Sequence, residues 1–163
     1  MPLIGLLSDT HAYLNPQLIP FFEKCDQIWH AGDWGSMEVV NALQAEKPVN
    51  AVYGNIDGYD IRKVFPRHNV FFCEEVKILL IHAGGYPGKY SYETQSLIER
   101  NQPQLFICGH SHILKVINDS QNYLLHINPG AAGKFGFHTV STAVRFAIDG
   151  NRIHSLEILE MKK

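Results

Sequence analysis

Aspartate, histidine and asparagine side chains recur along this chain at the ends of short apolar runs. Their oxygen and nitrogen atoms are the ones that hold divalent metal ions in proteins. The candidate metal ligands are Asp9, His11, Asp33, Asn55, His82, His110 and His112. Four of them form pairs two residues apart, and on an extended chain both members of such a pair point to the same side. Seven ligands exceed what one ion needs but suit two ions that share a bridging carboxylate.

The amide of Asn55 fits this interpretation because its carbonyl oxygen is a neutral metal ligand. Only Asp9 and Asp33 in the set are anionic, so two divalent cations leave a formal excess on the order of +2. Such an excess attracts a phosphate group and lowers the pKa of a bridging water toward neutrality. The residue types therefore indicate chemistry on a phosphate ester.

The elements that must position these residues alternate between apolar runs and helical patterns. Strands are expected at 3–9, 27–33, 49–55, 70–72, 77–85 and 104–110, and helices at 15–25, 36–46 and 91–101. Pro20 predicts that the first helix is short or kinked. The last third predicts antiparallel strands at 113–119, 122–128, 142–149 and 152–160, with a hairpin turn at 149–151.

Helix-connected strands followed by antiparallel strands predict an α/β (α+β) fold, with one mixed sheet or two sheets packed face to face between helices. In an open α/β sheet, ligands bind outside the carboxyl ends of the strands. Successive parallel strands should therefore bring the candidate residues to one edge.

Composition sets limits on the class of protein. The chain has 163 residues, of which 45% are hydrophobic and 18% charged, so one domain spanning 1–163 is expected. A formal net charge of −2 argues against an extended nucleic acid as partner. The apolar runs are too short to span a membrane, and the first residues lack the features of a secretory signal. Cys25, Cys73 and Cys108 lack CxxC spacing and are expected to be buried, reduced thiols of a cytoplasmic protein.

The remaining histidines predict supporting roles. His30, three residues before Asp33, is expected to pack behind the ligands or hydrogen-bond to one of them. His68, His126, His138 and His154 are expected to be structural or exposed. Cys108 is expected to be a small buried apolar residue. No G-x-S-x-G, H-E-x-x-H, P-loop or dinucleotide motif offers a competing chemistry.

The ordered motifs "SDTH", "HAGDW", "YGNID", "IHAGG" and "CGHSH" resemble those of the calcineurin-like metallophosphoesterase superfamily. The "GNID" form and the "NPG" after the last histidine pair look like its small, single-domain phosphodiesterase branch. The resemblance covers nearly the whole chain. It implies a four-layer α/β/β/α sandwich of two mixed β-sheets flanked by helices.

The resemblance also implies a role for each candidate residue. One metal would be held by Asp9, His11, Asp33 and His112. Asp33 would bridge to a second metal, completed by Asn55, His82 and His110. A metal-bridging hydroxide would then attack the phosphorus of a small phosphoester. Manganese, iron, zinc and nickel are all compatible with this ligand set.

Two positions depart from the superfamily pattern. Many members have a histidine directly after the asparagine, where this chain has Ile56, and a further histidine where it has Gly84. Both departures favour activated substrates or diesters over poor leaving groups. Asp57 could assist protonation, although orienting a neighbouring ligand is the favoured role.

The alternative function is a non-catalytic protein-interaction scaffold of the same fold, as in the retromer subunit, which has lost part of its ligand set. Here all seven ligand positions are filled, which favours the enzyme. A homo-oligomer is compatible with the sequence.

Overall fold

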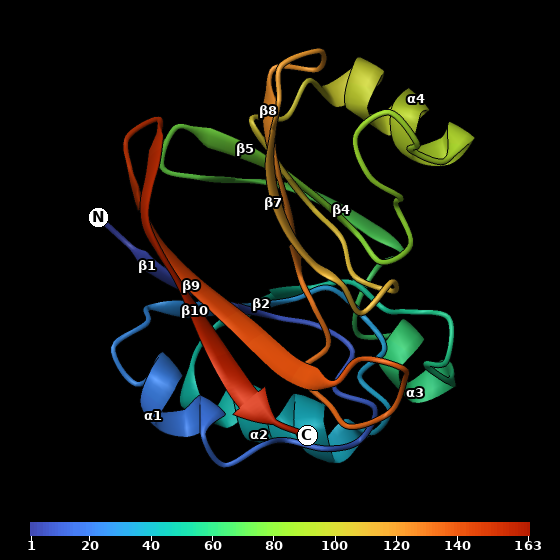
Figure 1. Cartoon of the computed structure of the whole chain (residues 1–163), viewed down its shortest axis with the longest axis vertical. Helices are drawn as coiled ribbons and strands as arrows, with labels where there is room; N and C mark the ends of the chain where they lie inside the picture. Colours follow the sequence, from blue (N-terminus) through green and yellow to red (C-terminus); the bar gives the residue numbers. More distant parts are fainter.

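The chain forms two five-stranded β-sheets in a computed structural model that describes residues 1–163 (Figure 1). In the order of their pairing, the strands of the first sheet are β10 (Arg152–Lys162), β9 (Val140–Asp149), β1 (Leu3–Leu7), β2 (Gln27–His30) and β3 (Val49–Ala51). Those of the second are β4 (His68–Cys73), β5 (Val76–Ile81), β6 (Leu105–Ile107), β8 (Leu124–Pro129) and β7 (Leu114–Asp119). In the first sheet β1, β2 and β3 are parallel and β9 and β10 add antiparallel strands on one side. In the second sheet β5, β6 and β8 are parallel, and β4 and β7 are antiparallel edge strands, so both sheets are mixed.

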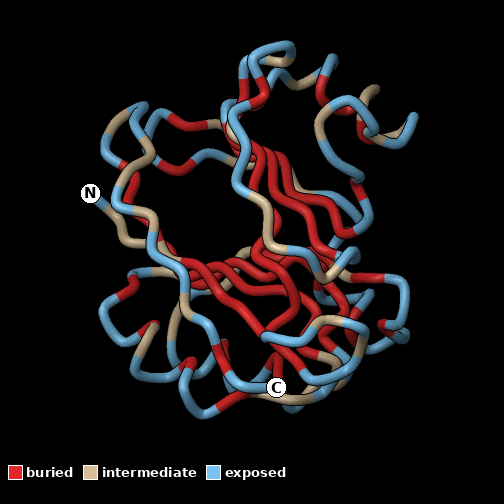
Figure 2. The backbone as a smooth tube through the Cα atoms, viewed as in Figure 1, coloured by how far each residue is buried: buried red, intermediate tan, exposed pale blue.

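Alternation of side chains along the strands divides the core into layers. On β5, Ile78 and Leu80 pack into a cluster between the sheets, while Leu79 and Ile81 pack into a different cluster on the outer face. Residues of β1 divide in the same way, because successive side chains on a strand point to opposite faces. Figure 2 shows these strands as the buried centre of the molecule.

Four helices cover the outer faces. The helices are α1 (Leu18–Phe22), α2 (Met37–Glu46), α3 (Tyr59–Arg62) and α4 (Tyr92–Asn101). The first three pack their buried side chains on the first sheet, and α4 packs on the second. The predicted four-layer α/β/β/α sandwich is therefore confirmed.

Several boundaries differ from those predicted. The helix expected at 15–25 is reduced to α1, because Pro20 lacks the N–H that would extend the hydrogen-bond ladder. The short α3 was not predicted, and its one buried side chain is Ile61. The predicted hairpin between β9 and β10 is confirmed, with Gly150 at a φ of 61° in its turn.

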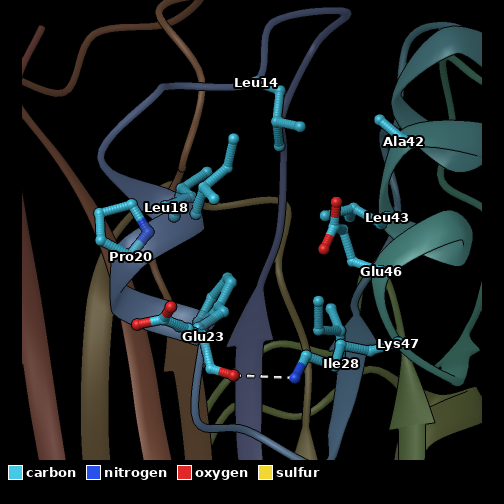
Figure 3. Close-up of a pocket in the computed structure, with 11 residues that line it drawn as sticks. Leu14, Leu18, Pro20, Glu23, Ile28, Ala42, Leu43, Glu46 and Lys47 are labelled. Carbon is cyan, nitrogen blue, oxygen red and sulfur yellow. Dashed lines mark hydrogen bonds between the residues drawn. The ribbon is translucent and has the colours of Figure 1, made fainter.

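A groove opens between α1 and α2 on the outer face of the first sheet (Figure 3). Its volume is about 440 Å³, and most of its lining is apolar. Glu23, Glu46 and Lys47 are its charged residues, and the Lys47 ammonium donates to the carbonyl of Glu23 at 2.8 Å. None of the candidate ligands lines this groove, so the predicted chemistry lies elsewhere.

The three cysteines are buried and unpaired, as predicted. No helix is long and apolar enough to cross a membrane.

Candidate metal centre

All seven candidate ligands lie in loops that follow the carboxyl ends of parallel strands. The loop after β1 carries Asp9 and His11, that after β2 Asp33, that after β3 Asn55, that after β5 His82, and that after β6 His110 and His112. β1, β2 and β3 are parallel in one sheet, and β5 and β6 are parallel in the other. His82 Nε2 of the second sheet lies 3.9 Å from Asp9 Oδ1 of the first. Both sheets therefore contribute to one cluster.

Asp9, His11 and His112 form a group whose ligand atoms lie within 4.8 Å of one another. Asp9 Oδ1 lies 3.2 Å from His112 Nε2 and 3.8 Å from His11 Nε2. The other carboxylate oxygen accepts hydrogen bonds from the Ser8 hydroxyl at 2.6 Å and from the His110 backbone N–H at 3.1 Å. Asp9 Oδ1 and His11 Nε2 are buried without a hydrogen-bond partner. Since buried polar atoms are normally satisfied, this pair fits a cation.

Asp33, His82 and His110 form a second such group, and Asn55 adjoins it. The Asn55 side-chain oxygen lies 3.1 Å from His110 Nδ1. His82 Nδ1 lies 2.7 Å from the carbonyl oxygen of Ala31, which can only accept, so Nδ1 carries a proton. In neutral His82, Nε2 then turns a lone pair toward Asp33 Oδ2 at 3.3 Å. Metal-binding histidines commonly donate their other ring N–H in this way.

Asp33 lies between the two groups. Its Oδ2 is 3.4 Å from His11 Nε2 and 3.3 Å from His82 Nε2. Its Oδ1 accepts from the backbone N–H of Ile56 at 3.1 Å, which fixes the carboxylate plane. One oxygen thus faces a member of each group, the placement that a bridging ligand needs.

Charges in this cluster depend on one another. Burial alone would raise the pKa of Asp9, but the neighbouring imidazoles of His11 and His112 and the charge of His82 hold it well below its usual range. The pKa of Asp33 is lowered by His82 against the effect of burial. Burial likewise opposes charging of His82, but Asp33 and Asp9 raise its pKa. The carboxylates are therefore ionised and need positive charge, for which protons and metal ions compete.

The family model for the calcineurin-like phosphoesterase superfamily domain matches residues 3–151. The chain belongs to this superfamily. It is 33% identical over 135 residues to a probable metallophosphoesterase of Methanothermobacter thermautotrophicus, an alignment that covers 79% of this chain and 76% of the relative.

Solved structures share the fold. Vps29 of Chaetomium thermophilum gives a TM-score of 0.76 at 14% identity, covering 99% of this chain and 97% of that one. A structure described as a novel archaeal phosphodiesterase gives a TM-score of 0.75 at 21% identity, covering 96% and 99%. At these identities the likeness concerns the fold alone.

This calcineurin-like phosphoesterase chain aims its two ligand pairs by tight turns. The prediction that each pair lies on extended chain is wrong, because β1 ends at Leu7 and β6 at Ile107. The φ angles are 54° at Asp9, 45° at His11, 72° at His110 and 63° at His112. This left-handed conformation costs a non-glycine residue about 1–3 kcal/mol and persists only where surrounding contacts enforce it. Such contacts include the N–H of Asp9 bonded to the carbonyl of Gly32 at 3.0 Å.

Gly54 and Gly109 allow neighbouring loops to touch. A Cβ atom on Gly54 would overlap the carboxylate and backbone nitrogen of Asp33, and one on Gly109 would overlap the side chains of Ser8 and Asp9. A side chain at either position would therefore displace a candidate ligand.

His30 connects the loops after β1 and β2 from behind the cluster. Its ring stacks on Trp34 with centroids 3.7 Å apart. The Thr10 hydroxyl donates to the Trp34 carbonyl at 2.9 Å, so it accepts from His30 Nε2–H at 3.1 Å. His30 Nδ1 accepts from the N–H of Gly32 at 3.0 Å. Burial lowers the pKa of His30 to about 3, which keeps the ring neutral.

Asp57 connects the loops after β2 and β3. Its buried carboxylate accepts from the backbone N–H groups of Trp34 at 3.2 Å, Gly35 at 3.0 Å and Gly54 at 2.8 Å. Trp34 directly follows the candidate ligand Asp33, and Gly54 directly precedes the candidate ligand Asn55. The contacts match an orienting role.

Sequence reasoning did not single out Asn128 as a side chain that shapes the centre. Its amide nitrogen donates to the carbonyl of Gly109 and to the hydroxyl of Ser111, both at 3.0 Å. Its amide oxygen accepts from the N–H of Gly130 at 3.0 Å. Asn128 thereby holds the turn that carries His110. Its place in "NPG", at the end of β8 beside β6, is the signal that could have identified it.

A cavity of about 520 Å³ opens over the cluster. We call it the site cavity, and its lining residues are His11, Asp33, Asn55, Ile56, His110, Ser111, His112, Ile113, Phe135, Gly136, Phe137 and His138. Phe135 stacks on the His11 ring at 4.9 Å, and Phe137 is fully exposed. Beside the candidate ligands, the walls of the site cavity are thus mainly apolar, and no lysine or arginine lines this cavity. Arg62 and Arg67 line a separate cavity of about 210 Å³, together with the candidate ligands Asn55 and His82.

The two residues that depart from the superfamily pattern, Ile56 and Gly84, differ in the space around them. Ile56 lines the site cavity and is 46% exposed, so a larger polar side chain would have room there. A Cβ atom on Gly84 would meet the Phe106 ring at 2.6 Å, which leaves no space for a further histidine.

The other histidines occupy varied positions. His68 is exposed and His154 partly buried, while His126 is completely buried. His138 Nε2 donates to the carbonyl of Gly133 at 2.8 Å and its ring lies edge-on to that of His112. Cys108 is completely buried, and burial raises the pKa of its thiol to about 12, in line with the predicted apolar role.

Proposed function

We propose that this protein is a dinuclear metal-dependent phosphodiesterase. The observation that carries the proposal is the pair of ligand groups joined by Asp33, with buried atoms of Asp9, His11 and His82 that lack hydrogen-bond partners. The residues that would hold one divalent cation are Asp9, His11, Asp33 and His112. Those that would hold the other are Asp33, Asn55, His82 and His110. Manganese, iron, zinc and nickel all suit mixed oxygen and imidazole ligands.

Two bound cations would supply Lewis acidity toward phosphoryl oxygens and would lower the pKa of water toward neutrality. The protein's own residues prepare for this. Asp9 and Asp33 stay ionised, and His82 keeps its proton on Nδ1 so that Nε2 offers a lone pair. Two dications against two carboxylates give a net positive site, which favours an anionic phosphate.

The walls of the site cavity favour a diester over a monoester. A phosphodiester carries one negative charge and two organic groups, and the cavity offers the apolar side chains of Ile56, Ile113, Phe135 and Phe137. A phosphomonoester carries up to two charges and would gain from a lysine or arginine, which this lining lacks. Ile56 cannot protonate a leaving group, so good leaving groups such as phenolates are favoured.

The second candidate function is a protein-interaction scaffold. The likeness of the fold to Vps29 and the exposure of Phe137 beside the centre support it. The complete ligand set favours the enzyme, since a scaffold has no need of buried unsatisfied ligand atoms.

Turnover and metal content together test the proposal. Bis(4-nitrophenyl) phosphate and 4-nitrophenyl phosphate are assayed with manganese, iron, zinc or nickel, and metal per chain is measured by elemental analysis. We expect two metals per chain, faster hydrolysis of the diester, and at least about a thousandfold loss in Asp33→Ala and His110→Ala. Asp60→Ala, an exposed carboxylate outside the cavity, is the matched control. Absence of turnover with every metal would favour the scaffold.

We also propose that residues 1–163 fold as one domain and that the protein is cytoplasmic. The core cluster between the sheets joins residues from Ile4 to Ile148, which supports the first. The buried, unpaired thiols support the second. Limited proteolysis and cell fractionation test these points.

A further inference from the structure

A second, smaller cavity of about 180 Å³ adjoins the site cavity. We call it the side cavity. His110, Ser111 and Ile113 line both cavities, so a ligand held at the candidate metals could extend from one into the other. Lys115, His126 and Tyr86 are further lining residues of the side cavity. No carboxylate lines it, which argues against a cation as its occupant.

A buried hydrogen-bond chain fixes the proton on His126. Asp119 accepts four hydrogen bonds, from the Tyr90 hydroxyl at 3.1 Å and from three N–H groups of Gln121 and Asn122. The Tyr90 hydroxyl gives its one proton to Asp119, so its oxygen accepts from His126 Nδ1–H at 3.3 Å. Nε2 of neutral His126 therefore carries a lone pair.

That lone pair is unused within the protein. His126 is completely buried, and its Nε2 has no hydrogen-bond partner. Tyr90, which binds the opposite ring nitrogen, does not line the side cavity, whereas His126 does. We infer that the ring edge bearing Nε2 is turned toward the cavity. Burial, with the nearby charge of Lys115, lowers the pKa of His126 to about 4, so this atom acts as an acceptor at neutral pH.

Two donors complement this acceptor. Ser111 Oγ accepts from Asn128 Nδ2 at 3.0 Å and from the N–H of Ile113 at 3.2 Å, which leaves its hydroxyl proton for a ligand. The Lys115 ammonium has no carboxylate partner and lies 4.0 Å from the centroid of the Tyr86 ring. The lysine occupies that face of the Tyr86 ring, so a flat base cannot stack on it there. The side cavity thus suits a compact group that both donates and accepts hydrogen bonds.

We propose that the side cavity binds the alcohol group of a phosphodiester substrate that carries free hydroxyls, with His126 Nε2 accepting a hydrogen bond from one of them. Lys115 and Ser111 donate to hydroxyl oxygens of the same group. Glycerol or sugar esters carry this chemistry, whereas plain alkyl esters do not. This assignment rests on the proposed phosphodiesterase function, because the phosphate must lie at the candidate metals.

Two substrates with the same leaving group test it. They are 2,3-dihydroxypropyl 4-nitrophenyl phosphate and ethyl 4-nitrophenyl phosphate. We expect kcat/KM to favour the dihydroxypropyl ester by about tenfold, the worth of one well-made buried hydrogen bond. In His126→Phe the ratio should fall to near one, and in His126→Gln, which restores an acceptor oxygen, it should partly recover. His154→Phe is the matched control, because it makes the same substitution on β10, far in sequence from the residues that line the two cavities. It should keep the wild-type ratio. Equal ratios in the wild type and His126→Phe would overturn the assignment.

A second measurement does not depend on turnover. The imidazole nitrogens of zinc-loaded wild-type protein are followed by nitrogen NMR during titration with sn-glycerol 3-phosphate and, separately, ethyl phosphate. We expect His126 to show a protonated Nδ1 and a bare Nε2, and its Nε2 resonance to move with glycerol phosphate alone. If neither ester is hydrolysed but this shift occurs, the phosphodiesterase function fails and the hydroxyl site stands. If esters are hydrolysed but Nε2 does not respond, the hydroxyl site is wrong.

Discussion

Replacing Asp57 tests whether the loops around the candidate centre are positioned by one buried carboxylate. Asp57 is 3% exposed and accepts three backbone hydrogen bonds, from Trp34, Gly35 and Gly54. In Asp57→Ala all three donors lose their acceptor. Those of Trp34 and Gly54 belong to buried residues, whereas Gly35 is exposed and can bind water instead.

The expected loss of stability follows from this count. A buried backbone N–H left without an acceptor costs about 1–3 kcal/mol, and a donor that turns to water costs about 0.5 kcal/mol. Two of the first kind and one of the second give about 2.5–6.5 kcal/mol for Asp57→Ala. Asp57→Asn keeps one acceptor oxygen, which can serve Trp34 and Gly54, and turns its NH₂ toward Gly35. That isosteric change should cost only about 1–2 kcal/mol.

Denaturant unfolding of chelator-treated protein measures these differences without any contribution from metal. Calorimetric titration with zinc then measures the effect on the centre. Because Trp34 follows Asp33 and Gly54 precedes Asn55, we expect Asp57→Asn to weaken zinc binding by about 10–100-fold.

The control is Asp60→Asn, an exposed carboxylate of α3 that pairs only with Lys63 at 3.9 Å. It should change stability by less than about 0.5 kcal/mol. If Asp57→Ala unfolds at the same denaturant concentration as Asp60→Asn and binds zinc equally well, the positioning argument is refuted.

Two further predictions concern Ile56 and the buried histidines. Ile56→His should raise hydrolysis of an alkyl phosphodiester by at least about tenfold over Ile56→Leu, because an imidazole there can protonate a poor leaving group; equal rates would place protonation elsewhere. The pKa values of His30 and His126 are lowered to about 3 and about 4, so the unfolded chain takes up protons near pH 6.5 that the folded chain refuses. The free energy of unfolding is therefore highest above about pH 6.5 and falls as the pH drops toward 4. Denaturant titrations at pH 7 and pH 4 measure this loss, and His126→Phe should make it smaller by about 3 kcal/mol. An unchanged pH dependence would contradict the lowered pKa.

The candidate ligands could be predicted from the sequence because two local signals coincide at each of them. Each follows an apolar run, and each has a side chain that binds divalent ions. The residue patterns predicted the strands but left one mixed sheet or two packed sheets open, and the four-layer sandwich followed from the resemblance to the superfamily. Whether a helix or strand forms depends mainly on residues that are neighbours in the sequence, so a single sequence is enough to predict it.

The conformation of the site loops was not predictable, because distant contacts determine it. Asp9 is held by the backbone N–H of His110, a partner 101 residues away in sequence. That contact supports left-handed backbone at both residues, which extended-chain reasoning excludes. The orienting contacts of Asn128 were not predicted, because an asparagine beside a proline is typical of a turn. The conformation of each loop thus depends on its contacts with another loop, and the sequence of one loop does not show which loop it will contact.

Loops from both sheets contribute to the candidate metal centre, and this explains how ligands on loops can have a rigid spacing. Asp9, Asp33 and Asn55 come from the first sheet, and His82 and His110 come from the second. The separation between the two sets is determined by the side chains packed between the sheets, which interdigitate at the density of a crystal. Asp33, whose Oδ2 lies 3.3 Å from His82, spans the junction. The core between the sheets therefore keeps the candidate ligands at fixed distances from one another. If one sheet slid over the other, the two halves of the ligand set would separate.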